Sequence, residues 1–380
     1  MAIANTTLRN LLAGEGDTVY RTIVSYPASS TYTPGTDITA VAVTGSKETL
    51  TVSTYLASRV DIDKTEKVQS IIDLGTNVSN KMMQDHNNRI EQAVLAEVTN
   101  ASWTLDAGNV GGTAGENATV NTNTVPLFFI AADTKLDAID APKAGRTAVI
   151  GGHFLGQLKL QQAGRQTVFG DGVNTRGVVT NLFGWDILYS NNLPFVVTLT
   201  IDTQPTDGDT FTVAGVTFTF KTTQGANAGA INICSTAALT LDNVVTSLNA
   251  LATTVAEATD AGYNKISDEN IFLLRDKRRI VAAEVTATTL TISGYGDIVV
   301  SETFTAATNV FSAWRQDSLF CVKGCIDIIV QIPPEITTDP HPFQFATIVK
   351  SLLGFGKKTY ADGAREMVRV KINAGTSDWA

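Results

Sequence analysis

The stretch from Glu66 to Val98 most constrains the fold, because it contains no proline and repeats apolar residues at three- and four-residue steps. That spacing places the apolar side chains on one face of an α-helix. The preceding residues, Asp63-Lys64-Thr65-Glu66, have the pattern of a capping box. We therefore expect one uninterrupted amphipathic helix, about 50 Å long at ~1.5 Å per residue, with Gly75 as a mild bend. Its apolar positions are Val68, Ile71, Ile72, Val78, Met82, Ile90, Val94 and Val98.

The segment before this helix predicts a long two-stranded ribbon. Residues 37–62 alternate β-branched and polar side chains on both sides of Gly45-Ser46, which we interpret as a hairpin turn. A ribbon of two strands is marginally stable alone, so we expect it to lie on another surface, such as a second subunit. Residues 1–36 contain Pro27, Pro34 and Gly35 and are interpreted as an irregular arm.

Later segments combine helices and strands, which predicts an α+β protein. Helices are expected at 125–140 and 153–162, and strands at 146–150 and 366–373. Residues 317–330 fit a helix or a mixed apolar segment. The composition changes at 195–312, where Thr, Val and Gly dominate and short alternating runs surround one helix expected at 242–256. We interpret 195–312 as a compact β-rich domain inserted into the rest of the chain.

The chemistry that the sequence offers points away from catalysis. The chain has 28 Lys and Arg against 37 Asp and Glu, which gives a net charge of -9. A protein that binds nucleic acid through its phosphates is normally basic. No apolar run approaches the ~20 residues of a membrane span, and no secretory signal is visible. The nearest string to a phosphate-binding loop, 354–359, lacks the required spacing. We therefore expect no catalytic, cofactor-binding or metal-binding residues and no cofactor.

The cysteines, histidines and charged clusters of the sequence fit structural roles better than metal binding or catalysis. Cys321 and Cys325 are four apart, unlike common zinc sites, and with Cys234 are expected to be buried. The three histidines, His86, His153 and His341, lie far apart, and His86 is expected to serve packing or the surface. The basic run 275–279 is expected in a solvated loop or an inter-subunit salt bridge rather than in contact with nucleic acid. Acidic pairs with turn-like surroundings are Asp61/Asp63 and Asp207/Asp209.

The order of these elements resembles the major capsid proteins of tailed bacteriophages with the Hong Kong 97-type fold. The ribbon at 37–62 looks like the E loop of that family, and the helix at 66–98 looks like its spine helix. The runs 146–150, 184–194 and 354–372 are similar to later parts of the family's core. The resemblance covers residues 1–194 and 313–380, and it lies in the order of elements rather than in a strict motif.

The resemblance implies a domain plan. Residues 1–36 would be the N-terminal arm and 37–64 the E loop. Residues 65–194 and 313–380 would form the capsid core, with its spine helix and its P and A subdomains. Residues 195–312 would be the β-rich insertion domain.

The resemblance also implies a function and partners. The chain would be a major capsid protein and not an enzyme, made in the cytoplasm of a host bacterium and located in the virion capsid. It would assemble with itself into hexamers and pentamers of an icosahedral shell around double-stranded DNA, without binding that DNA specifically and without a membrane. A separate scaffolding protein, a portal and decoration proteins are further expected partners.

Other functions stay open at this point. The Thr-rich segment at 195–312 also suits a phage tail-tube or adhesin subunit, and a bacterial nanocompartment shell would share the fold. An enzyme or sugar-binding module is a third class, with Trp185 or Trp314 as a stacking platform. The shell interpretation depends on the uninterrupted helix and on a ribbon that neighbouring subunits hold.

Overall fold

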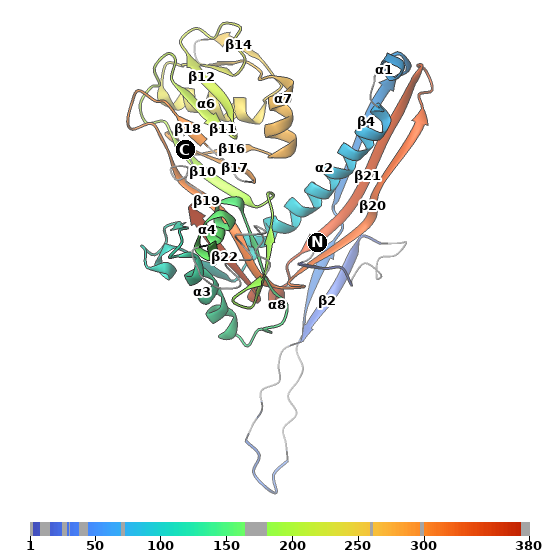
Figure 1. The fold of residues 1–380 in the computed structure, drawn as a ribbon, viewed down its shortest axis with the longest axis vertical. Coiled ribbons are helices and arrows are strands. Elements are labelled where there is room, and N and C mark those ends of the chain that lie inside the picture. The colour runs from blue at the N-terminus through green and yellow to red at the C-terminus, as the bar shows by residue number, and fades with distance from the viewer. Residues whose placement is uncertain are drawn as a thin grey trace. The chain divides into compact units, whose positions relative to one another are not determined.

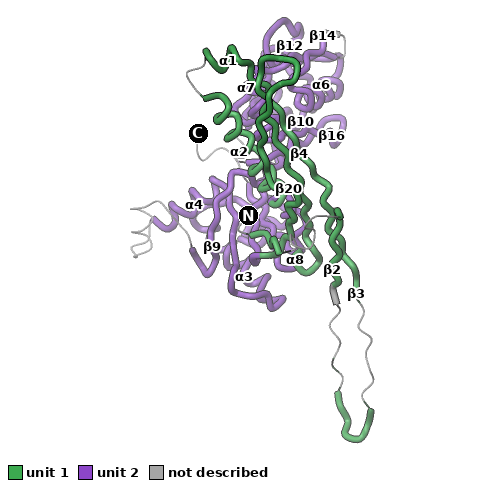
Figure 2. Tube along the Cα trace, turned by 90° about the vertical axis from the view of Figure 1, so that its right-hand side faces the viewer, with its two compact units in different colours: residues 1–94, 324–364 green, residues 95–323, 365–380 purple. Residues whose placement is uncertain are grey.

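The computed structural model describes most of the chain and divides it into two compact units. The described residues are 3–7, 16–24, 29, 31–37, 45–69, 73–163, 181–258, 261–296 and 300–373. Unit 1 contains residues 1–94 and 324–364, and unit 2 contains 95–323 and 365–380 (Figure 2). Both units are assembled from segments far apart in the sequence, and each is described below by itself.

A four-stranded sheet with one long helix along it forms the body of unit 1 (Figure 1). Its strand order is β1-β20-β21-β4, where β1 is Ala4–Asn5, β20 Ile326–Pro340, β21 Ala346–Lys358 and β4 Thr54–Asp63. Helix α2, Leu74–Ala96, packs its Met82 against Ile62 and Val349 of the sheet. Alternate residues of these strands therefore face α2, and the residues between them face away.

The expected uninterrupted helix from Glu66 to Val98 is wrong. A short helix, α1, covers Lys64–Gln69, and α2 begins only at Leu74. Asp73 explains the second start, because its carboxylate accepts hydrogen bonds from the backbone N–H groups of Gly75, at 3.1 Å, and Thr76, at 3.4 Å. Asp63 does precede α1 as expected and accepts from the backbone N–H of Thr65 at 2.7 Å. Of the expected apolar positions, Val68 is 77% exposed, and Ile71 and Ile72 lie outside the described residues.

The expected hairpin around Gly45-Ser46 is also wrong. Both residues open strand β3, Gly45–Thr51, which pairs antiparallel with β2, Thr18–Val24, so they belong to a strand and not to a turn. Strand β4 pairs with β21, from Asp63 opposite Ala346 to Thr54 opposite Phe355. Residues 38–44 of the expected first strand lie outside the described residues. The actual ribbon is β2–β3, and its base packs on the body through Val19, Leu50 and Val52 against Ile329 and Tyr360.

A ten-stranded sheet organises unit 2. Its main order is β16-β17-β10-β19-β7-β9-β8, and β22 pairs with β19, β5 and β6. The expected strands 146–150 and 366–373 are observed as β7 and β22, and the helices expected at 125–140 and 153–162 as α3 and α4. Residues 317–330 are strands β19 and β20 rather than a helix. The bounds are β5 Trp103–Leu105, β6 Ala118–Thr119, α3 Val125–Asp137, β7 Arg146–Ile150, α4 Gly152–Ala163, β8 Asn181–Leu182, β9 Trp185–Tyr189, β10 Pro194–Thr200, β16 Val281–Thr286, β17 Thr289–Tyr295, β19 Val310–Val322 and β22 Met367–Asn373. Short 3-10 turns lie at η2 Glu97–Asn100 and η3 Ala107–Val110.

A second sheet of unit 2 comes entirely from the Thr-rich segment. Its order is β14-β15-β13-β12-β11-β18. Helix α6 covers Ala237–Asn249, so the helix expected at 242–256 was placed too late. Thr236 caps its start by accepting from the backbone N–H of Leu239, and Val255–Ala258 is strand β14. The other bounds are β11 Thr210–Val213, β12 Val216–Lys221, β13 Ala230–Asn232, β15 Ala261–Tyr263, α7 Asp268–Ile271, η4 Phe272–Lys277 and β18 Val300–Glu302.

Unit 2 has two apolar cores that divide along the sequence. One cluster of buried residues runs from Phe195 to Phe311, and the other draws on residues from Leu105 to Ile187 and from Phe320 to Ile372. The ten-stranded sheet nevertheless continues through both, because β10 pairs with β17 on one side and with β19 on the other. The segment 195–312 therefore has its own core on a shared sheet.

Candidate assembly surfaces

The base of the β2–β3 ribbon carries an ionic cluster in which the carboxylate of Asp327 is buried. Arg21 of β2 forms ion pairs with Asp327 of β20, at 3.6 Å, and with Asp362 of α8, Ala361–Arg365. Its guanidinium lies 5.0 Å from the ring centroid of Tyr360, within the range of a cation–π contact. Asn5 of β1 donates its side-chain N–H to Asp327 at 2.7 Å. The cluster therefore ties the ribbon, the N-terminal arm and the C-terminal part of unit 1 together.

Burial sets the electrostatics of this cluster. Desolvation raises the pKa of Asp327, and the charge of Arg21 and the hydrogen bond from Asn5 oppose that rise. Desolvation also raises the pKa of Tyr360, and the nearby Asp327 acts in the same direction. The guanidinium of Arg21 thus compensates the charge of the Asp327 carboxylate, which is held away from water. Because Arg21 lies on β2, this ion pair also fixes where the ribbon leaves the body of unit 1.

A chain of polar side chains crosses the contact between α2 and the sheet. His86 Nε2 lies 2.8 Å from the hydroxyl of Ser351 on β21, which lies 2.6 Å from the hydroxyl of Ser58 on β4. His86 is buried, and desolvation lowers its pKa. Its Nδ1 has no hydrogen-bond partner among the described residues. The expectation that His86 serves packing is confirmed, and its position favours the neutral imidazole.

Large apolar side chains are exposed at several places in unit 1. Tyr55 and Leu352 lie on the sheet face that points away from α2, and Phe343 and Phe345 lie in the turn between β20 and β21. In unit 2, Phe272 and the β16 residues Val281 and Val285 are exposed. Exposed groups of this kind on a folded chain often mark contacts with other proteins.

The residues considered for chemistry from the sequence are scattered and mostly structural. Cys234, Cys321 and Cys325 are buried free thiols, as expected. Asp61 pairs with Arg59 at 2.7 Å, and Asp207 accepts from the backbone N–H of Thr222 at 2.8 Å. Within the described residues no group of three or more His, Cys, Asp or Glu could hold a metal ion, and no helix there is long and apolar enough to span a bilayer.

Of the two stacking platforms in the sugar-binding alternative, burial excludes Trp185, and Trp314 packs against a neighbouring ring. Trp185 is fully buried and packs edge-to-face on Phe320, with ring centroids 5.2 Å apart. Trp314 is partly buried against Phe311, with centroids 6.0 Å apart. The string 354–359 lies in strand β21 and its following residue, not in a phosphate-binding loop. In the basic run, Arg275 pairs with its sequence neighbour Asp276 at 3.0 Å, and residues 275–277 lie in η4 rather than in a loop; the expected inter-subunit salt bridge stays a prediction.

Sequence reasoning missed the Arg21–Asp327 cluster and the exposed turn. The cluster joins residues more than 300 positions apart in the chain, so no local pattern could reveal it. The turn had a signal in the sequence, because two prolines stand just before two aromatic residues and prolines favour turns and exposed strand edges. The residues are Pro340-His341-Pro342-Phe343-Gln344-Phe345.

Comparison with known proteins places the fold. No family model matches the chain, and no curated protein matches it either. Among solved structures, a chain of Mycobacterium phage Che8 superimposes with a TM-score of 0.53 at 12% identity, covering 98% of this chain and 89% of that one. A chain of the capsid of cyanophage P-SCSP1u superimposes with a TM-score of 0.51 at 14% identity. That match covers 93% of this chain and 83% of the cyanophage chain. The α+β, Hong Kong 97-type capsid fold expected from the order of elements is thereby confirmed.

Proposed function

We propose that this chain is the major capsid protein of a tailed bacteriophage and assembles with itself into an icosahedral shell around double-stranded DNA. The observation that carries the proposal is the shared fold with phage structures over nearly the whole chain. At such low sequence identity the likeness speaks for the fold, so the function rests on what that fold supplies.

The fold supplies parts that suit a shell better than an enzyme. The β2–β3 ribbon is anchored at its base by Arg21, and Tyr20 of β2 and Tyr32, in the described residues between the two strands, are exposed. A two-stranded ribbon with exposed aromatic side chains gains stability when a neighbouring subunit covers it. Interfaces in permanent assemblies bury several thousand Å², and ribbons and arms provide such area.

The proposal includes partners, location and a domain plan. The partners are further copies in hexamers and pentamers, a separate scaffolding protein, a portal and decoration proteins. With a net charge of -9, the chain would enclose DNA without specific binding. It would be made in the host cytoplasm, reside in the virion capsid and perform no catalysis.

Residues 1–36, 37–64, 65–194 with 313–380, and 195–312 keep their proposed roles as arm, E loop, core and insertion. The separate core of 195–311 supports the last of these. Because β2 pairs with β3, the ribbon would start within the proposed arm.

Expression of the full chain, alone and with the scaffolding candidates encoded beside it, tests the proposal. Negative-stain microscopy and sedimentation should show closed shells. Open tubes or rings would instead favour a tail-tube subunit, and shells that capture a bacterial cargo enzyme would favour a nanocompartment.

A ribbon variant provides a matched control. Val24 lies opposite Gly45 in the last pair of the ribbon that the structure describes, so residues 25–44 can be replaced by Asn-Gly, a dipeptide that closes two-residue hairpins. The shortened chain should keep its unfolding midpoint and lose the ability to form shells. Normal shells from this variant would contradict the role proposed for the ribbon.

A further inference from the structure

Residues 341–345, here called the aromatic turn, expose two phenylalanines at the junction of β20 and β21. Phe343 is 91% and Phe345 is 86% exposed, more than any other large apolar residue among those described. Covering exposed aromatic side chains removes apolar surface from water, so both phenylalanines would stabilise a contact with another surface.

The backbone of the aromatic turn is held in one conformation. The backbone N–H of His341 donates to Ala346 O at 2.9 Å, and that of Phe343 donates to His341 Nδ1 at 3.1 Å. The backbone N–H of Lys64, the first residue of α1, donates to Phe345 O at 2.8 Å. Pro342 fixes one further dihedral angle. Side chains presented on a fixed backbone lose little entropy on binding, which is the property of an anchor.

A pocket of about 510 Å³ lies elsewhere on the same unit, across strands β4, β20 and β21. Ser351 points toward His86 of α2, so its neighbours Lys350 and Leu352 point to the opposite, open face of the sheet. Leu352 is 42% exposed there, which gives the pocket an accessible apolar side chain. The lining residues are Ala57, Ser58, Arg59, Glu335, Thr337, Lys350, Ser351 and Leu352.

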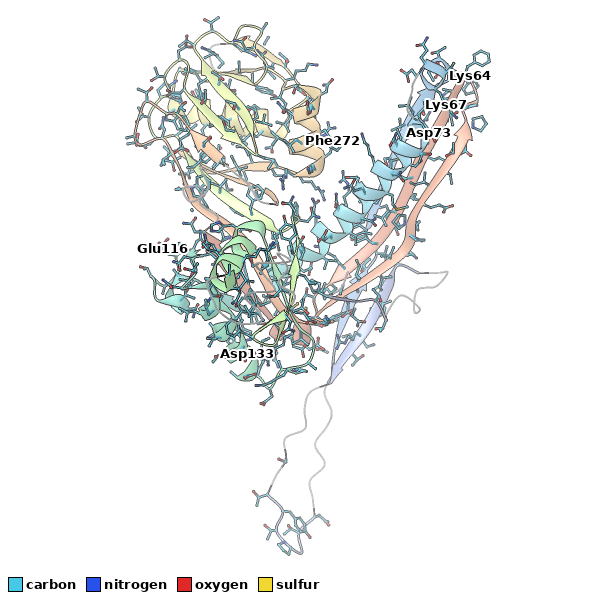
Figure 3. The ribbon with its side chains drawn as sticks, viewed as in Figure 1. Lys64, Lys67, Asp73, Glu116, Asp133 and Phe272 are labelled. Carbon is cyan, nitrogen blue, oxygen red and sulfur yellow. The ribbon has the colours of Figure 1, made fainter. Side chains whose placement is uncertain are left out.

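The charges beside the turn and in the pocket are complementary. In the pocket, Arg59 is paired with Asp61 at 2.7 Å and Lys350 with Asp339 at 2.6 Å, whereas Glu335 has no ion pair among the described residues. Lys64 and Lys67 of α1 also have no ion pair among the described residues. Both lie at the same end of the sheet as the aromatic turn (Figure 3).

We propose that the aromatic turn of one copy of this chain binds in the sheet pocket of a second copy, with Lys64 and Lys67 facing Glu335. Phe345 and Ser351 are six positions apart along β21, about 20 Å at ~3.3 Å per residue, so a chain cannot fill its own pocket. Each copy presents both halves of the contact. Such a contact joins different surfaces of two copies and closes into a ring when the rotation allows. The inference rests on the proposed function, in which copies lie side by side.

Disulfide trapping between two separately tagged full-length variants tests this contact. One carries Phe343→Cys or Phe345→Cys and the other Leu352→Cys, and they are mixed before assembly and then oxidised. The three native cysteines are buried and should not react. We expect a cross-linked dimer that contains both tags. The matched control replaces Leu352→Cys by Lys81→Cys, an exposed position on α2, and should give at least about tenfold less of it.

The outcomes separate the contact from the proposed function. Shells without the mixed-tag dimer, or with only a turn-to-turn dimer, would overturn the contact and leave the capsid function standing. If the unmodified chain forms no shells, the capsid function fails. The contact is then judged on the concentrated unassembled chain, where a missing mixed-tag dimer rejects it and a specific one supports it.

A charge exchange gives a second measurement that needs no cysteine. Glu335→Lys should slow assembly about tenfold, because it places like charges opposite one another, and Lys64→Glu with Lys67→Glu in the same chain should restore the rate. All three side chains are exposed, so the unfolding midpoint serves as a check that folding is unchanged. A loss that the compensating changes fail to rescue would count against the pairing.

Discussion

His86 is a buried ionisable side chain in the contact between α2 and the sheet of unit 1. Its only hydrogen bond among the described residues is to Ser351, and burial lowers its pKa. The folded chain therefore binds fewer protons at this position than the unfolded chain in the range just below the ordinary pKa of about 6.5. The contribution of His86 to the free energy of unfolding is therefore present above about pH 6.5 and is lost as the pH falls below it.

Substitution of His86→Gln should flatten the pH dependence of stability. At pH 8 the variant should be less stable by about 1 kcal/mol, the usual net value of one hydrogen bond. At pH 5.5 the difference should shrink or reverse, because the variant has no imidazole to keep neutral. Urea unfolding at several pH values measures this. His153→Gln, from outside the contact, is the control, and a pH-independent penalty for His86→Gln would show that proton binding is not the cause.

At the scale of elements, Asp73 decides where the long helix begins. The sequence analysis identified only Asp63 as a cap, whereas the structure uses Asp63 and Asp73, which leaves α1 and α2 as separate helices. The hydrogen bonds from Thr76 and Gly75 lower the pKa of Asp73, with the Thr76 hydroxyl contributing most, so the carboxylate is the form that caps. The shell interpretation depended on an uninterrupted helix and on a ribbon held by neighbouring subunits. Neither condition is met as stated, because the helix is in two pieces and β4 of the expected ribbon pairs with β21 of its own chain. The capsid fold is supported instead by the likeness to solved structures.

Removing the cap should destabilise unit 1 without altering its fold. Asp73→Ala should lower the free energy of unfolding by about 1 kcal/mol, because N–H groups at the start of α2 lose their acceptor. Asp73→Ser should recover most of that loss, since serine caps comparably. Chemical denaturation of the three proteins measures the effect. Equal stability of the alanine and serine variants would show that the hydrogen bonds to Asp73 contribute little.

For the whole molecule, the central question is whether 195–312 is an independent module. Its core cluster lies within 195–311, with only Trp314 contributing from outside. Phe195 lies opposite Gln316, so the chain leaves and returns on adjacent strands. Contacts across the boundary include the hydrogen bond from the Gly296 N–H to Leu193 O at 2.7 Å. The module is thus joined to the core by one sheet but has its own apolar interior.

Replacing 195–312 by Asn-Gly should leave a chain that still folds. The buried cluster of Leu105–Ile187 and Phe320–Ile372 is untouched by this change, so a cooperative thermal transition should remain. Circular dichroism and size-exclusion chromatography measure it, and the isolated segment 195–312 serves as the companion sample. Aggregation of both pieces would show that the shared sheet, not the separate cores, determines the cooperative unit.

The local pattern determined much of unit 2 and little of unit 1. The strands at Arg146–Ile150 and Met367–Asn373 and helix α3 follow from runs of apolar residues bounded by proline and glycine. Residues 317–330 were ambiguous, because a continuous apolar run fits a buried strand and a buried helix equally well. The candidate assembly surfaces could not be predicted from the sequence, because they depend on which exposed side chains the tertiary structure brings together.

By itself, the sequence determined the order and type of most elements, and that order was enough to indicate a capsid fold. Only the tertiary structure decided the strand partners: β4 pairs with β21, where Ser58 meets Ser351 from 293 positions away, and β3 pairs with β2 rather than with β4. The physical reason is that helix caps and apolar periodicity act between near neighbours in the chain. Strand pairing instead depends on which distant edge can cover the same apolar face.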